Sequence, residues 1–209
     1  MTASFTLSLE HAAAGAEPAV LNLDAEEALI ARCLLGDSES FRPLVQRYQR
    51  VVFSVAFRML GARADAEDVA QQAFVDAFGA LDRFRSEGRT NAFSTWIIRI
   101  AINRCKDVLK SKKRTEESLD ADVAGGEAMF AHDPRDPEAS LAQVRQRHAL
   151  ERALARVPPK YREVLVLKDV EELSYEEIRE ILALPITTLK IRVVRARAMM
   201  REHLGQETR

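Results

Sequence analysis

Apolar residues recur at steps of three and four along most of this chain, the spacing that places them on one face of a helix. The pattern predicts a first helix from about residue 24, and further helices over residues 41–60, 65–81, 92–111 and 141–157. A break at Gly36 follows the first helix, and Gly61 is a good stop for the second. No segment alternates apolar and polar residues for long enough to predict a sheet. The fold class predicted is all-α.

Two short helices separated by a tight Leu-Pro break are predicted in the stretch from Leu173 to Leu204. Ser174 and Glu177 form a capping box, so the first of these helices should start at Tyr175. Pro185 suits the first turn of the second, where no backbone donor is lost. The apolar positions of the second helix define its buried stripe: Ile186, Leu189, Val193, Ala196 and Met200.

The second helix of this pair is strongly basic, with five cations and no acid between Thr187 and Arg201. The residues that remain for its outer face, once the buried stripe is assigned, are Thr187, Thr188, Lys190, Ile191, Val194 and Arg195. Taken by itself, the run of cations is explained by a solvated face on an ordinary bundle helix. The run of cations together with the capping box and the short turn favours a helix-turn-helix unit that reads the major groove of DNA.

The predicted helix over residues 92–111 carries a second basic stripe. From Arg83 to Arg114 there are ten cations against two acids. Polar residues at helical spacing share one face: Arg99, Asn103, Lys106, Lys110 and Lys113. Such a stripe beside aromatic side chains suits a nucleic-acid backbone and unstacked bases. Core packing is the alternative for Trp96 and the stronger interpretation for Phe93.

Composition limits the remaining possibilities. The 209 residues are 47% hydrophobic and 30% charged, with only eight glycines and seven prolines, which supports helical domains with charged surfaces. Two distant cysteines, Cys33 and Cys105, predict neither a disulfide framework nor a zinc site. With no apolar run of transmembrane length, we expect a cytoplasmic protein.

Four segments are expected along the chain. Residues 1–22 form a loose tail, 23–114 a first helical domain, 115–140 a flexible acidic linker and 141–209 a second domain. From Glu116 to Ser140 there are eight acids and one cation, together with Gly125-Gly126 and two prolines. A solvated spacer is the main interpretation of this segment, and an acidic strap that masks basic surfaces is the alternative.

No bond-making chemistry is expected. The four histidines are scattered without a metal spacing, and no phosphate-binding glycine loop or nucleophile elbow is present. We therefore expect no catalytic residue, no metal, no cofactor and no small-molecule substrate.

Three segments resemble the extracytoplasmic-function group of bacterial sigma factors, within the sigma-70 family. They are GARADAEDVAQQAFVDAF at residues 61–78, FSTWIIRIAINRCKDVLKSKKR at residues 93–114, and the stretch VPPKYREVLVLKDVEELSYEEIREILALPITTLKIRVVRARAMMREHL at residues 157–204. The resemblance covers nearly all of the chain from Asp24 to Leu204, in the family's order. It implies a sigma-2-like helical bundle and a sigma-4-like helix-turn-helix domain.

The resemblance implies three sets of site residues. Contact with the clamp helices of the RNA polymerase β′ subunit is implied for Asp68, Gln71, Gln72 and Phe74. Contact with the −10 element is implied for Thr90, Asn91, Trp96, Arg99, Asn103, Lys106 and Lys110, where the loop from Ser86 to Asn91 captures a flipped base. Contact with the −35 element is implied for Thr187, Thr188, Lys190, Ile191 and Arg195.

Several positions depart from the family pattern. Ala183 and Thr187 stand where glycine is usual, and Ile191 stands where a small polar residue is usual. Ile191 and Val194 place apolar groups on the expected base-reading face, where they can pack on thymine methyls or bury against an inhibitor protein. The loop from Arg85 to Ala92 is also longer than the common pattern.

The function implied is that of an alternative sigma factor, a monomer when free. Its implied partners are core RNA polymerase, through the β′ clamp helices and the β flap, promoter DNA, and an anti-sigma factor. A free-standing helix-turn-helix regulator would explain the last helix pair but not the basic aromatic helix, and an adaptor bundle would leave both basic stripes unused.

Overall fold

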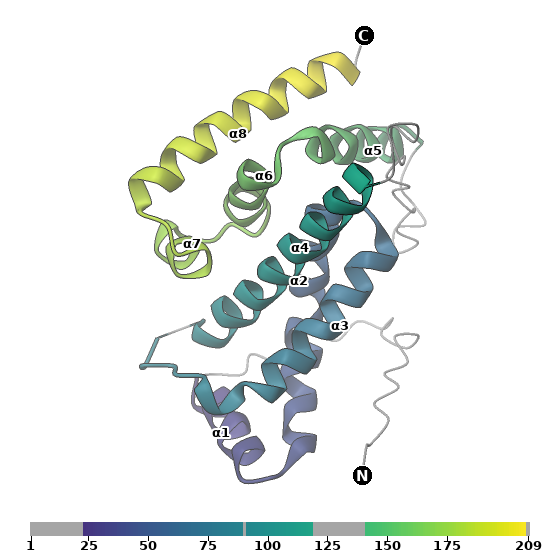
Figure 1. The fold of residues 1–209 in the computed structure, drawn as a ribbon. Helices are drawn as coiled ribbons and strands as arrows, with labels where there is room; N and C mark the ends of the chain where they lie inside the picture. The colour runs from purple at the N-terminus through teal and green to yellow at the C-terminus, as the bar shows by residue number, and fades with distance from the viewer. Residues whose placement is uncertain (1–22, 90, 119–140, 208–209) are drawn as a thin grey trace.

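The computed structural model describes residues 23–89, 91–118 and 141–207, and these residues form helices and turns without any strand (Figure 1). The α-helices are α1 (Leu23–Leu34), α2 (Arg42–Leu60), α3 (Arg63–Gly79), α4 (Ala92–Ser118), α5 (Leu141–Arg156), α6 (Pro159–Leu165), α7 (Tyr175–Leu182) and α8 (Ile186–Glu207). Two short 3-10 helices, η1 (Ser38–Phe41) and η2 (Leu81–Arg83), and a π-helical turn, η3 (Val166–Val170), connect them. The all-α prediction is confirmed.

Some expectations fall on parts of the chain that the structure leaves undescribed. The predicted N-terminal tail, Thr90 and residues 119–140 of the predicted acidic linker lie outside the described residues. None of the helices that are described is both long and apolar enough to cross a membrane.

Local signals end α2 and begin α7 as predicted. Gly61 follows α2 with φ +75°, and its N–H donates to the Phe57 carbonyl at 2.7 Å. Both hydrogen bonds of the capping box form, because the Ser174 hydroxyl accepts from the Glu177 N–H and the Glu177 carboxylate accepts from the Ser174 N–H. Helix α7 therefore starts at Tyr175, as expected.

Helices α3 and α4 differ at one end from the prediction. Helix α3 starts at Arg63, two residues before the expected start at residue 65, after an extended Ala62 without a side-chain cap. Asp65 lies instead in the first turn, where its charge suits the helix dipole, and it pairs with Lys112 of α4. Helix α4 continues to Ser118, because residues 111–118 contain no glycine or proline and several good helix formers.

An aromatic core centred on Phe93 joins α1–α4. The Phe93 side chain is fully buried, which confirms core packing for this residue. Its ring lies 5.3 Å from that of Tyr48, 5.6 Å from Phe84 and 5.7 Å from Trp96. The Tyr48 hydroxyl donates to the buried Glu26 carboxylate at 2.5 Å, and burial raises the pKa of Tyr48. This core fixes the start of α4 and the approach to the loop before it.

A second core crosses between the two halves of the chain. Val55 and Met59 of α2 and Ile98, Ile102 and Cys105 of α4 belong to one buried cluster with residues from α5–α8. The contributions of the second half are Leu154, Val164, Leu165, Val166, Leu167, Ile178, Ile181, Leu182, Leu189, Val193 and Ala196. Figure 1 shows α6 and α7 beside α4, with α8 on their outer side. The halves therefore pack together rather than standing apart.

The apolar residues near the end of α5 are only partly buried. Leu154 of α5 and Val157 just after it are buried, whereas Leu150 is 50% exposed. Helix α5 packs against α8 and α2.

Ala183 ends α7 in the left-handed conformation, with φ +53°, at the position where the family usually has glycine. An L-residue pays a steric cost there that glycine avoids. Ala183→Gly should therefore raise the free energy of unfolding by about 1 kcal/mol in denaturant titrations.

The matched control for this change is Ala198→Gly, at an exposed interior position of α8. Glycine there should lower stability by roughly 0.5–1 kcal/mol. Equal destabilisation by both substitutions would contradict the strain assigned to Ala183.

Candidate nucleic-acid and polymerase interfaces

The outer face of α8 has the geometry of a recognition helix. Leu189, Val193 and Ala196 are buried against α6 and α7, which turns the opposite side outward. The predicted −35 residues Thr187, Lys190, Ile191 and Arg195 are exposed, and Thr188 is half-buried. Val194 is exposed beside them, so the predicted base-reading face combines cations with apolar groups.

The cations of α8 divide into paired and available ones. Arg192 contacts Glu163 at 3.1 Å, and Arg197 makes two hydrogen bonds to Asp169 at 2.6 and 2.8 Å.

Lys190 instead lies 5.7 Å from the ring centre of Tyr175. A hydrogen bond with Arg195 lowers the pKa of Tyr161. Lys190 and Arg195 are thus held by aromatic side chains without a carboxylate partner among the described residues, and their charges remain free for phosphates.

The predicted polar stripe of α4 lies on its surface. Arg99, Asn103, Lys106 and Lys110 are all exposed, as their spacing required. Lys106 differs from the other three because its ammonium contacts the buried carboxylate of Glu163 on α6, at 2.8 Å. Glu163 therefore binds one cation from α4 and one, Arg192, from α8.

Trp96 lies between the core and the surface. It is half-buried, with its ring 5.2 Å from Phe84 and 5.7 Å from Phe93. Packing on two buried rings holds the indole in place, and its remaining surface lies at the start of the polar stripe.

The loop before α4 bends sharply. Glu87, Gly88 and Asn91 all have positive φ, between +50° and +68°. Asn91 tolerates this conformation better than most residues. The Ser86 hydroxyl donates to Glu27 of α1 at 2.5 Å, and the Arg89 N–H donates to the Ser86 carbonyl at 3.0 Å. These bonds tie the described part of the predicted base-capture loop to α1.

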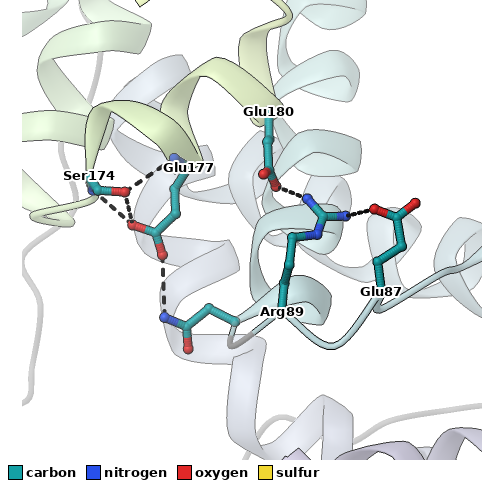
Figure 2. A network of polar contacts seen from close by, with 6 residues as sticks. Glu87, Arg89, Ser174, Glu177 and Glu180 are labelled. Carbon is teal, nitrogen blue, oxygen red and sulfur yellow. Dashed lines mark hydrogen bonds and ion pairs between the residues drawn. The ribbon is translucent and has the colours of Figure 1, made fainter.

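Acids of α7 bind this loop (Figure 2). Arg89 lies between Glu87 and Glu180, at 3.5 and 2.5 Å. The Asn91 amide donates to Glu177 at 3.3 Å. Burial raises the pKa of Glu177, but hydrogen bonds from Ser174 and Asn91 outweigh it and hold that pKa below its usual value. Glu177 is therefore an anion at neutral pH.

A cavity of about 420 Å³ opens beside the loop, between α1 and the segment that follows η2. Its walls include Ile30, Leu34, Phe84, Ser86 and Glu87. The sequence does not predict this cavity, because the residues that line it lie about fifty positions apart and share no local pattern.

The predicted polymerase-binding residues lie on α3, and one of them is not on its surface. Asp68, Gln71 and Gln72 are exposed, whereas Phe74 is only 8% exposed and packs in the core. Its expected outward position is therefore wrong, because Phe74 shares the buried face with Ala73 and Ala77.

The exposed face of α3 also carries apolar residues that sequence reasoning missed. Val75 is 56% exposed and Phe78 is 44% exposed. Val75 lies four residues after Gln71 and Phe78 three residues after Val75, so helical spacing places both on the same face as Gln71. Behind this face, Asp76 accepts two hydrogen bonds from Arg104 of α4 at 2.5 and 2.7 Å, and they lower its pKa.

No cluster suited to a metal ion is found within residues 23–89, 91–118 and 141–207, where His, Cys, Asp and Glu nowhere gather in threes. The interfaces described above consist of cations, amides, hydroxyls, apolar groups and the carboxylate of Asp68.

Comparison with known proteins gives these surfaces a context. Two family models match the chain: Sigma-70 region 2 at residues 44–115, and Sigma-70, region 4 at residues 147–200. The ECF RNA polymerase sigma factor SigW of Bacillus subtilis (strain 168) is 37% identical over 174 residues, which are 81% of this chain and 91% of SigW. The ECF RNA polymerase sigma-E factor of Escherichia coli (strain K12) is 34% identical over 176 residues, which are 82% and 90% of the two chains.

The chain belongs to the extracytoplasmic-function (ECF) sigma factors. It is therefore a transcription initiation factor, and the resemblance found in its sequence is confirmed.

Solved structures agree with the fold of this sigma factor. The structure of CnrH in complex with the cytosolic domain of CnrY matches with a TM-score of 0.59 and 28% identity, covering 88% of this chain and 99% of CnrH. The sigma factor RpoE of Bartonella quintana, solved with the anti-sigma factor NepR, shares the fold with a TM-score of 0.65 and 22% identity, over 80% and 98% of the two chains.

Proposed function

We propose that this sigma factor binds core RNA polymerase in the cytoplasm, directs it to particular promoters and promotes melting of the start region. The observation that carries the proposal is the pair of separate basic surfaces, the outer face of α8 and the polar stripe of α4. A free-standing helix-turn-helix regulator needs only the first of these surfaces.

The −35 element is assigned to the outer face of α8. Lys190 and Arg195 supply charge for phosphates or base edges, and Thr187 and Thr188 lie at the N-terminal end of the helix, which enters the groove in such units. Ile191 and Val194 fit thymine methyl groups on the same face.

The −10 element is assigned to α4 and its preceding loop. Arg99, Asn103, Lys106 and Lys110 follow the DNA backbone along one stripe, and Trp96 offers a partly exposed ring for stacking. Asn91 and Thr90 belong to the loop assigned to the flipped base, and the cavity beside that loop offers space for one.

Polymerase docking is assigned to the exposed face of α3. Asp68, Gln71 and Gln72 form its polar part, and Val75 and Phe78 add apolar area of the kind enriched in protein interfaces. This face is proposed for the β′ clamp helices, and the helix-turn-helix half for the β flap.

An anti-sigma factor is the proposed regulatory partner. CnrH, 28% identical to this chain, was solved with the cytosolic domain of CnrY. Exposed apolar residues, Ile191 and Val194 on α8 among them, are suitable for burial against such a protein.

In vitro transcription with purified core polymerase tests the proposal as a whole. Fragments of the source genome serve as templates, and transcripts are mapped with and without the sigma factor. We expect promoter-specific transcripts only when it is present. If it binds duplex DNA without the polymerase and initiates no transcript from any template, the free-standing regulator is the correct function.

Lys190→Ala and Arg195→Ala should each weaken binding to −35 duplex DNA by about 1–3 kcal/mol, measured by fluorescence anisotropy of the holoenzyme. The reason is the loss of one charged contact to DNA. Affinity for core polymerase should stay normal.

The control is Arg201→Ala, which removes the same charge from α8 three turns after Lys190. It should have little effect, because recognition helices contact bases through their N-terminal part. Equal losses in all three variants would contradict the assigned register of α8.

Asp68→Ala and Gln71→Ala should each reduce affinity for core polymerase by about 1 kcal/mol or more in competition assays against a labelled sigma factor. Both side chains lie on the face assigned to the clamp helices. Gln46→Ala, an exposed amide of α2 outside that face, is the matched control. Normal core affinity in both α3 variants would place the docking surface elsewhere.

A further inference from the structure

Gln72, Asp76 and Arg104 form a hydrogen-bonded chain that runs from the exposed face of α3 to α4. Arg104 donates to the two carboxylate oxygens of Asp76, from Nε at 2.5 Å and from Nη2 at 2.7 Å. Gln72 Nε2 donates to the same carboxylate at 3.0 Å. Two parallel bonds between a guanidinium and a carboxylate fix the orientation of both groups. Arg104 therefore holds the Asp76 carboxylate in place while that carboxylate binds an exposed amide of α3.

The surroundings of Asp76 make it an acceptor only. The hydrogen bonds from Arg104 and Gln72 hold the pKa of Asp76 below its usual value, against the opposite effect of burial. The same pairing raises the pKa of Arg104. An ionised carboxylate has no proton to donate, so any group that hydrogen-bonds to Asp76 at neutral pH must itself be the donor.

This requirement fixes which way the Gln72 amide faces. Its NH2 group must point to Asp76, so the carbonyl oxygen, on the other branch of the amide, turns away from that carboxylate. A glutamine without such a tether offers its donor and acceptor sides equally, because the amide can rotate by half a turn. Gln72 is exposed, and its carbonyl oxygen is the side of the amide left for a partner.

We propose that Asp76 is a positioning residue of the polymerase-docking face, where it orients the Gln72 amide so that the partner meets a hydrogen-bond acceptor. The partner supplies a donor at this point, such as a lysine, an arginine or an amide N–H. An amide that is already held also loses less rotamer freedom on binding, which favours association. This inference rests on the proposed function, because it takes docking through α3 as given.

A double-mutant cycle separates positioning from direct contact. Asp76→Ala, Gln72→Ala and the combined variant are compared with the wild type for affinity to core RNA polymerase, in competition against a labelled sigma factor. Each single change should weaken binding roughly three- to tenfold, and the combined variant should bind no more weakly than Gln72→Ala alone. If Asp76 touched the polymerase itself, or only stabilised α3, its loss would add to that of Gln72.

Exchange of donor and acceptor tests the orientation of the amide. Asp76→Asn puts a donor where the amide needs an acceptor, and Gln72→Glu places a second carboxylate beside Asp76, so each change alone should weaken docking. Made together, they keep the net charge, and the new asparagine donates to the new glutamate, whose other oxygen is again an acceptor for the partner. The combined variant should bind core polymerase within about twofold of the wild type.

Asp65→Ala is the matched control for Asp76→Ala. Asp65 pairs with Lys112, so it also joins α3 to α4, and its side chain is 29% exposed compared with 28% for Asp76. It lies about three turns before Asp76 on α3. In denaturant titrations the two alanine variants should lose similar stability, but only Asp76→Ala should weaken docking.

The inference is overturned if Asp76→Ala leaves core affinity unchanged, if its loss adds to that of Gln72→Ala, or if Asp65→Ala weakens docking equally. A stable exchanged variant that still docks weakly also contradicts it. Normal core affinity in Gln72→Ala, with a loss in Asp68→Ala, refutes the positioning role alone. Normal core affinity in both of these variants refutes docking through α3, which is the part of the proposed function on which the inference rests.

Discussion

Helix α4 must bury apolar side chains along most of its length, and this requirement organises both halves of the protein. Phe93, Ile97 and Ala101 pack into the aromatic core of the first half. Ile98, Ile102 and Cys105 pack into the cluster shared with α5–α8. Only one stripe of the helix remains polar, so the cations that would contact DNA gather there.

The same polar stripe has two possible partners with equivalent chemistry. A carboxylate of the second half and a phosphate of DNA both offer oxygen acceptors to lysine, arginine and asparagine. Exposed pairs beside the stripe, such as Arg89 with Glu180, contribute little stability individually because water screens them. The shared apolar cluster is what brings Glu163 of α6 to Lys106 of the stripe.

The departures from the family pattern at Ala183, Thr187 and Ile191 lie in the turn before α8 and in the first turns of α8. Ala183 takes the left-handed conformation that the turn requires, so the turn keeps its shape without the usual glycine. Ile191 and Val194 are exposed beside the free charges of Lys190 and Arg195. A face of this kind combines phosphate contacts with apolar contacts to thymine methyls, which differs from a purely polar base-reading surface.

The helices and most of their ends follow from local sequence, because they depend on neighbours a few residues apart. The Ser174–Glu177 capping box, the stop at Gly61 and the outward stripe of α4 were all predictable for this reason. Family motifs extended the prediction to the kind of protein, since they preserve residue types at set spacings. Only the tertiary structure decided that Phe74 is buried while Phe78 is exposed, and that Glu163 binds Lys106. Those outcomes depend on how helices dock, and docking joins residues far apart in the chain that no local periodicity relates.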